Sequence, residues 1–301
     1  MRYVARVITS LWIVLSASSP IYGQIYKYVG IDDGLSSRNV YAVLQSNDGF
    51  MWCLTDMGID RYDGTEVNRY TLTINGVKFT EYSSCRFRYD RTTDNLWLIT
   101  SGGKVIQYVR RNNNFEVMYS PDIQYRRSDI IRCVASPIDS EGNLWLLVGE
   151  QAFRYNVYTN EGHEMTLLCK DSDIAFATIA SVGDSTLYIG AKGGVYRGIV
   201  SKEAIEVLPI PELQHTRINV NTFYYSEAFK TLLIGTEDAG ILAYRESTGE
   251  LIHHKDLLPD VRVTRIIPYS DDTEVLFSTN AACVFRMALD DCVPQRYLSA
   301  D

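Results

Sequence analysis

Apolar residues gather in short runs that return at nearly constant intervals along the chain. Three runs carry a tryptophan at their second position: Met51–Thr55, Leu96–Thr100 and Leu144–Val148. Three weaker copies follow at Leu187–Ala191, Leu232–Thr236 and Val275–Thr279. Successive copies lie 45, 48, 43, 45 and 43 residues apart at the second position. Short strands at this period, with no helical pattern between them, predict an all-β protein: a β-propeller of four-stranded antiparallel blades.

The first repeat shows how one blade is built. Asn39–Gln45 is a predicted strand, and Asp48-Gly49 supplies the positive φ of a tight turn. The next strand, Phe50–Thr55, is apolar at successive positions, as expected where both faces of a sheet are covered. Two further predicted strands, Ile59–Tyr62 and Val67–Tyr70, complete the blade. Because each blade of a propeller packs on its neighbours, we expect its middle strands to have no solvent-exposed side.

Six copies of the pattern predict six blades in this chain. The segment Ile25–Val29 precedes the first copy and is left over as an additional strand. Such a strand commonly pairs into the last blade and closes the ring, but the sixth repeat already has four predicted strands of its own. The alternatives are therefore a closed six-bladed ring and an open part of a seven-bladed ring. An open ring would leave sheet faces exposed, which a stable domain avoids.

The N-terminus has the pattern of an export signal. Arg2 and Arg6 flank the start of the apolar run Val7–Leu15, and small or turn-forming residues follow up to Gly23. The run is too short to span a bilayer and fits the core of a signal peptide. We expect cleavage after Gly23, which makes residues 1–23 a signal peptide and residues 24–301 a periplasmic propeller sensor domain. The alternative is an uncleaved signal anchor. Later apolar runs have the length of strands, so we expect no other membrane-spanning segment.

The net charge bears on the class of partner, and the cysteine pattern bears on whether disulfides form. The chain of 301 residues has a formal net charge of −8, and its basic residues are scattered, which argues against nucleic acid as a partner. Its six cysteines include no CxxC pair. We interpret them as buried thiols, with a Cys283–Cys292 disulfide across the last hairpin as the alternative in an exported protein.

Three segments of the first repeat carry a specific resemblance. D-G-L-S-S at Asp33–Ser37 is followed by D-G-F-M-W at Asp48–Trp52 and by R-Y-D-G at Arg61–Gly64. This series resembles the two-component regulator propeller repeat, and Glu141–Trp145 of the third repeat matches it in part. The last three repeats keep only the strands and turns.

The resemblance implies the extracytoplasmic sensor region of a hybrid two-component system. In that family, propellers precede a β-sandwich domain, a membrane helix and a histidine kinase. The implied ligand is an oligosaccharide, and the implied partner is a second copy of the chain, forming a homodimer. Since six repeats occupy the chain after its leader, we expect it to lack the kinase. We therefore expect a non-catalytic, ligand-sensing propeller of signal transduction that needs no cofactor and no metal.

Candidate ligand-binding residues lie in the loops that follow the second strands and in the loops between blades. In a propeller these loops meet at one face, where ligands commonly bind. Their side chains can hydrogen-bond sugar hydroxyls or an acidic sugar. The candidates are Arg38, Asp56, Arg126, Arg127, Lys192, Glu237 and Asn280.

Two other classes of function stay open. A propeller glycosidase or lyase would need acids that converge from several blades, and Asp56, Glu150, Glu237 and Asp238 all follow second strands. A degenerate interaction scaffold would bind no ligand at all.

Two further features are interpreted as structural. Trp52, Trp97 and Trp145 share one repeat position, so we expect them to pack between blades rather than to stack on sugar. Asp139–Asn143 resembles part of a calcium loop but lacks the remaining ligands, and it falls where each blade has its first hairpin turn.

Overall fold

The protein is described by a computed structural model that covers residues 27–123, 133–169, 174–183, 185–214, 218–254, 257–258, 261–269, 272–281 and 283–298. Its regular structure is almost entirely strand, which confirms the predicted all-β class. The helical elements are single turns: η1 (Ile31–Asp33), η2 (Tyr82–Ser84), η3 (Arg110–Asn112) and α2 (Pro211–Gln214). Over the described ranges, no helix combines the length and the hydrophobicity needed to cross a membrane.

Four sheets each contain four consecutive antiparallel strands. The first consists of β1 (Val40–Gln45), β2 (Met51–Thr55), β3 (Gly58–Tyr62) and β4 (Val67–Tyr70). The second consists of β7 (Arg86–Asp90), β8 (Asn95–Ile99), β9 (Val105–Val109) and β10 (Asn114–Tyr119). The third of these sheets consists of β19 (Val220–Ser226), β20 (Thr231–Thr236), β21 (Ile241–Arg245) and β22 (Glu250–His253). The fourth consists of β23 (Val263–Tyr269), β24 (Glu274–Thr279), β25 (Val284–Ala288) and β26 (Pro294–Leu298). The repeat therefore predicts these four blades correctly.

The third and fourth repeats are joined into one eight-stranded sheet. The third repeat forms the meander of β11 (Cys133–Ala135), β12 (Asn143–Val148), β13 (Gln151–Asn156) and β14 (Glu161–Cys169). The fourth repeat forms the meander of β15 (Phe176–Val182), β16 (Thr186–Ala191), β17 (Gly194–Val200) and β18 (Ala204–Pro209). The outer strands β14 and β18 pair in parallel, with Thr166–Cys169 opposite Ala204–Val207. The prediction of six separate sheets is wrong here, because β14 is long enough to hydrogen-bond to the free edge of β18.

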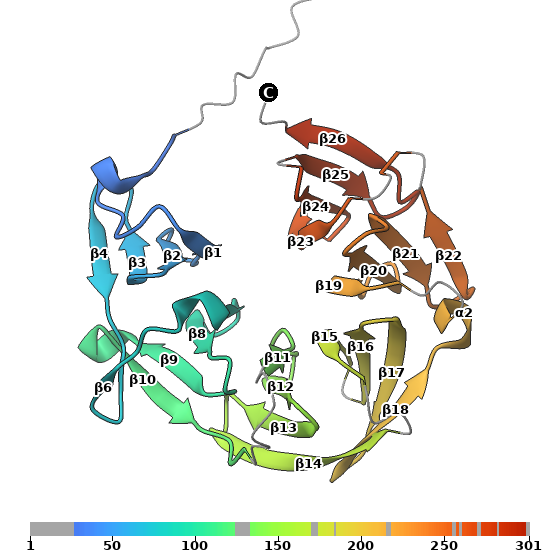
Figure 1. Ribbon diagram of the computed structural model, residues 1–301, viewed down its shortest axis with the longest axis horizontal. Coiled ribbons are helices and arrows are strands. Elements are labelled where there is room, and N and C mark those ends of the chain that lie inside the picture. The colour runs from blue at the N-terminus through green and yellow to red at the C-terminus, as the bar shows by residue number, and fades with distance from the viewer. Residues whose placement is uncertain are drawn as a thin grey trace, which may run out of the picture.

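The sheets are arranged around a common centre like the blades of a propeller (Figure 1). The first strand of each meander lies nearest the centre and the fourth lies at the periphery. The ring is open between the first sheet, drawn in blue, and the last sheet, drawn in red. The described residues thus do not form a closed six-bladed ring.

Five apolar clusters hold the ring together, one between each pair of successive meanders. Trp52 lies in the first cluster, Trp97 in the second and Trp145 in the third, and all three side chains are buried. The second strands β12 and β20 are buried at every position, as the continuous apolar runs predicted. Packing between blades is therefore the role of the repeated tryptophan position.

The segment that leads into the first sheet covers part of that sheet instead of joining the last one. Residues 27–30 form no strand, so the expected extra strand is not found there, and residues 25–26 lie outside the described ranges. The Lys27 ammonium instead donates to the Tyr62 hydroxyl of β3. Farther along, the Ser36 amide donates to the buried Asp60 carboxylate at 2.6 Å, and the Ser36 and Thr55 hydroxyls are 2.7 Å apart. The D-G-L-S-S motif therefore fixes the entry into the first blade.

The last sheet is covered on one face only. Along β24, Val275, Phe277 and Thr279 are buried, while Leu276 and Ser278 between them are partly exposed. The buried side chains face the sheet β19–β22, whose members share their cluster. The alternation is the pattern of a half-exposed sheet, in contrast to β20.

The cysteines carry no disulfide. All six thiols are free, including Cys283 and Cys292, so the alternative of a bridge across the last hairpin is wrong. The two residues lie at opposite ends of β25: Cys283 precedes the strand and is partly exposed, and Cys292 lies in the turn that follows it and is buried in the apolar cluster of the last two sheets.

Candidate functional site

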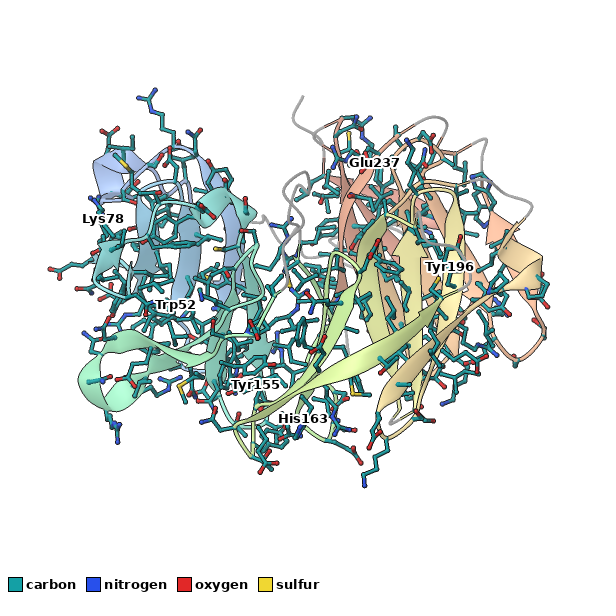
Figure 2. All side chains as sticks on the ribbon, turned by 60° about the horizontal axis from the view of Figure 1, so that its bottom comes forward. Trp52, Lys78, Tyr155, His163, Tyr196 and Glu237 are labelled. Atoms are coloured by element: carbon teal, nitrogen blue, oxygen red, sulfur yellow. The ribbon has the colours of Figure 1, made fainter. Side chains whose placement is uncertain are left out.

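The loops after the second strands lie at one end of the sheets, because every meander has the same strand order. The loops before the first strands reach the same end, as the pairing of Val40 with Thr55 shows for the first sheet. Candidates on this rim are Arg38, Asp56, Lys192, Glu237 and Asn280. Figure 2 shows Glu237 at that end of the molecule and His163 toward the opposite one. Arg126 and Arg127 lie outside the described residues.

In the first sheet, Asp56 is tied to the loop that precedes β1. The Asn39 side-chain amide donates to its carboxylate at 3.1 Å. Hydrogen bonds from the side chains of Ser37 and Asn39 hold the pKa of Asp56 below its usual range, so the group is ionised at neutral pH. Arg38 is adjacent and exposed. The loop before β1 thus holds the Asp56 carboxylate and also carries an exposed arginine.

Lys192 and Glu237 are connected through the backbone of Asn219. Lys192 forms a bridge to Asn219, and the Glu237 amide donates to the Asn219 carbonyl at 2.8 Å. Both side chains are exposed. Neighbouring loops of the fourth and fifth meanders are thus locked together by main-chain bonds that leave the charged groups in solvent.

Glu237 and Asn280 meet at Arg262. The Arg262 guanidinium pairs with the Glu237 carboxylate at 3.0 Å. The Arg262 amide donates to the Asn280 side-chain oxygen at 3.2 Å, and the Asn280 amide donates back to the Arg262 carbonyl at 3.0 Å. Of the sequence candidates, the structure therefore links Lys192, Glu237 and Asn280 in series along the rim, while Asp56 belongs to the first sheet.

A hairpin that the repeat does not contain shapes a cavity on the first two sheets. It consists of β5 (Thr73–Ile74) and β6 (Val77–Lys78), joined at Asn75-Gly76. Both turn residues have positive φ, 52° and 78°, which asparagine and glycine adopt readily. The Asn-Gly pair between two β-prone dipeptides is the sequence signal that could have found this hairpin.

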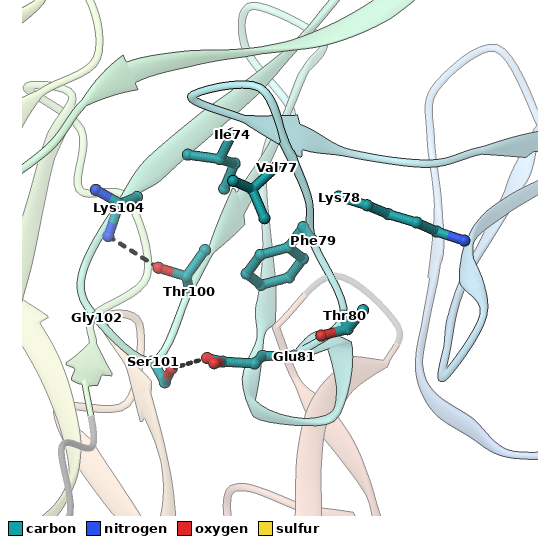
Figure 3. Close-up of a pocket in the computed structure, with 10 residues that line it drawn as sticks. All are labelled: Ile74, Val77, Lys78, Phe79, Thr80, Glu81, Thr100, Ser101, Gly102 and Lys104. Atoms are coloured by element: carbon teal, nitrogen blue, oxygen red, sulfur yellow. Dashed lines mark hydrogen bonds between the residues drawn. The ribbon is translucent and has the colours of Figure 1, made fainter.

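The cavity has a volume of about 560 Å³ and lies between the hairpin and the turn after β8 (Figure 3). Its lining residues are Ile74, Val77, Lys78, Phe79, Thr80, Glu81, Thr100, Ser101, Gly102 and Lys104. The Phe79 ring faces the cavity, and Lys78 points away from it (Figure 3). The cavity is half open to solvent and combines one apolar ring with hydroxyl and charged groups.

Polar side chains that line this cavity take part in hydrogen bonds. The Ser101 hydroxyl lies 3.4 Å from the Glu81 carboxylate. The Lys104 ammonium donates to the Ser120 hydroxyl at 2.7 Å. These contacts fix the orientation of one acid, one amine and one hydroxyl next to the exposed apolar side chain of Val77.

The segment Asp139–Asn143 is a hairpin turn, as predicted. The Asp139 carboxylate accepts the amide of Asn143 at 2.8 Å and that of Glu141 at 3.1 Å, which are the bonds of a hairpin turn. Among the described residues, no group of three or more His, Cys, Asp or Glu is arranged to hold a metal ion.

Comparisons with known proteins identify the fold. No family model matches the chain, and no curated protein matches it in sequence. Solved structures do: the extracellular domain of the putative hybrid two-component system BT3049 from B. thetaiotaomicron is 18% identical with a TM-score of 0.63. That match covers 91% of this chain and 37% of the other. The corresponding domain of BT4673 from the same organism is 18% identical with a TM-score of 0.62, covering 89% and 34%.

The similarity extends to propellers of other kinds. The β-propeller domain of Cps50 (Swd1) from Myceliophteria thermophila is 14% identical with a TM-score of 0.60, covering 89% of this chain and 88% of that one. This chain spans about a third of the length of the two B. thetaiotaomicron domains. The fold is therefore a β-propeller shared with extracellular domains of putative hybrid two-component systems, in agreement with the resemblance of the first repeat.

Proposed function

We propose that this chain is an exported, ligand-sensing propeller of a two-component regulatory system and that its ligand is an oligosaccharide. One observation carries the proposal: its fold matches extracellular domains of putative hybrid two-component systems over about nine tenths of the chain. The resemblance of its first repeat to the regulator propeller repeat supports it. The pattern of the N-terminal leader supports a periplasmic location. A second copy of the chain is the proposed partner, through which binding would shift the relation of two subunits.

The cavity beside the β5–β6 hairpin supports a sugar as ligand. Sugars present hydroxyl groups at their edges and apolar C–H faces, and the cavity offers Phe79 beside Glu81, Ser101 and Lys104. The exposed Lys192, Glu237 and Asn280 of the rim offer further hydrogen-bonding groups.

We infer that binding proceeds without catalysis. Hydrolysis by a pair of carboxylates requires the two groups to flank one bond, at separations of roughly 5 to 10 Å. Asp56 belongs to the first sheet and is bound by Asn39, while Glu237 belongs to the fifth meander and is paired with Arg262. Neither acid lines the cavity described above.

A thermal-shift screen of the mature protein against a panel of oligosaccharides tests this proposal. A ligand at a hundred times its dissociation constant stabilises the folded state by about 2.7 kcal/mol, which raises the melting temperature of a domain of this size by roughly 5 °C. We expect such a rise with at least one sugar, and we expect that sugar to be recovered intact. A folded sample that shifts with no sugar would favour the scaffold, and a cleaved sugar would favour the glycosidase or lyase.

A further inference from the structure

The tip of the β5–β6 hairpin holds the only Asn-Gly pair in the sequence, Asn75-Gly76. Both residues are exposed, and their φ angles of 52° and 78° form a two-residue turn. An asparagine before a glycine is chemically labile, because the amide nitrogen of the next residue can attack the side-chain carbonyl carbon and glycine has no side chain to block it. The reaction then depends on whether the fold leaves both groups free.

Neither reacting group is held by a hydrogen bond. Within the described ranges, no hydrogen bond involves the Asn75 side chain or the Gly76 amide. A Cβ added at Gly76 would meet no atom within 4 Å, so the space around this residue is open. The carbonyl carbon that would be attacked and the nitrogen that would attack it are therefore both unprotected.

The Asp-Gly turns of the first repeat show the contrast. The Asp48 carboxylate accepts a hydrogen bond from the Arg110 guanidinium at 2.7 Å. The Asp63 carboxylate accepts one from the Glu66 amide at 2.7 Å. Side chains bonded in this way must break a contact before they can react, whereas Asn75 has no such contact to break within the part of the chain that the structure describes.

The hairpin can open at its tip while its base stays in place. Its two strands share two residue pairs, of which Ile74 with Val77 is the one next to the turn. A two-stranded hairpin of this length is marginally stable by itself in water. At the base, the Phe79 amide donates to the Leu72 carbonyl at 2.9 Å. Brief opening of the tip gives the Gly76 nitrogen the freedom to approach the side chain before it.

The reaction balances with water as its single co-reactant. The Gly76 nitrogen, after it loses its proton, forms a bond to the side-chain carbonyl carbon of Asn75. The bond from that carbon to the side-chain nitrogen breaks, so ammonia leaves and a cyclic succinimide remains. Water then adds to one of the two carbonyl carbons of the ring. Opening on one side gives aspartate, and opening on the other gives isoaspartate, in which the main chain runs through the former side chain.

We propose that Asn75 is a deamidation site, at which attack by the Gly76 amide converts the turn into aspartate and isoaspartate and thereby alters one wall of the cavity. The inference does not depend on the proposed function. Ile74 and Val77, which flank the turn, both line that cavity (Figure 3). Isoaspartate lengthens the main chain by one carbon, which should break the pairing of these two residues. Either product also places a negative charge where a neutral amide stood.

Peptide mass spectrometry of the mature protein, after incubation at slightly acidic and at slightly alkaline pH, tests the site. Trypsin releases Asn75 as the single asparagine of residues 70–78, and Asn68 as the single asparagine of residues 62–69. Asn68 is also exposed but precedes an arginine, whose side chain hinders attack, so it is the matched internal control. We expect deamidation to be at least tenfold more extensive at Asn75, to accelerate with pH, and to give aspartate and isoaspartate together.

Gly76→Ala separates this route from direct hydrolysis of the side chain. The added methyl group shields the amide nitrogen, so we expect deamidation of Asn75 to fall at least tenfold. Deamidation no greater than at Asn68, aspartate as the sole product, or a rate unchanged by Gly76→Ala would each overturn the proposal. A melting curve checks that the variant folds, and the comparison of the two asparagines within the original protein holds even if it does not.

Hydrogen–deuterium exchange of the incubated protein tests the altered cavity wall. We expect residues 72–79 to exchange faster after incubation than in fresh protein, because isoaspartate breaks the pairing next to the turn. Unchanged exchange in a deamidated sample would overturn this part of the proposal.

Discussion

Replacing Trp52 with alanine should lower the free energy of unfolding by about 3 to 5 kcal/mol, the usual cost of removing a buried aromatic side chain from a core. Trp52 is 2% exposed and lies in the cluster that joins the first two sheets. Its ring packs edge-on against Tyr108 at 4.7 Å between centroids and lies 5.6 Å from Tyr70. Its indole N–H donates to the Ser46 hydroxyl at 3.1 Å, so truncation also removes one hydrogen bond of a buried hydroxyl.

Urea unfolding of Trp52→Ala and of two companions measures this effect. Trp52→Phe keeps a ring in the cluster and should cost less than the alanine change. Tyr41→Ala removes an aromatic side chain that is 45% exposed on β1 and should cost under about 1 kcal/mol. If Trp52→Ala cost no more than Tyr41→Ala, the tryptophan would not be a packing residue, and its assignment to the interface between blades would be wrong.

Replacing Phe277 with alanine should have an effect of similar size, about 3 to 5 kcal/mol, at the other end of the chain. Phe277 is 1% exposed and stacks on Phe285 with 5.2 Å between ring centroids. The described contacts of the last sheet place its apolar cluster against one neighbour only, the sheet β19–β22. Loss of this side chain should therefore loosen β23–β26 before the rest of the ring.

The adjacent residue provides the control. Leu276 precedes Phe277 on β24 and points to the opposite, partly exposed face. We expect Leu276→Ala to cost under about 1 kcal/mol. Limited proteolysis should cut Phe277→Ala first within the last repeat, while Leu276→Ala should resist like the original protein. Equal costs for the two substitutions would mean that both faces of the last sheet are covered, contrary to its observed burial.

The sequence predicted the parts of the fold that depend on local patterns. Second strands such as Leu144–Val148 are continuous apolar runs because blades cover both faces, and the structure places them within a residue of the predicted bounds. The parallel pairing of β14 with β18 could not be foreseen, because it depends on how far two outer strands extend in space. The opening of the ring likewise depends on contacts between the two ends of the repeat series.

The candidate sites were less predictable than the fold. Rim residues such as Glu237 and Asn280 follow from the repeat, since every blade presents the same loops. The cavity beside Phe79 depends on an inserted hairpin that interrupts the repeat. The Asn75-Gly76 pair of that hairpin is a turn signal that the sequence does contain.

Hydrogen–deuterium exchange of the mature chain tests most directly the claim that sheets stack face to face about one centre. If they do, amides of the second strands β8, β12, β16 and β20 open only with global unfolding and exchange most slowly. We predict slower exchange in these four strands than in the peripheral strands β4, β10 and β22. Second strands that exchange as fast as the peripheral ones would contradict the propeller packing on which the account rests.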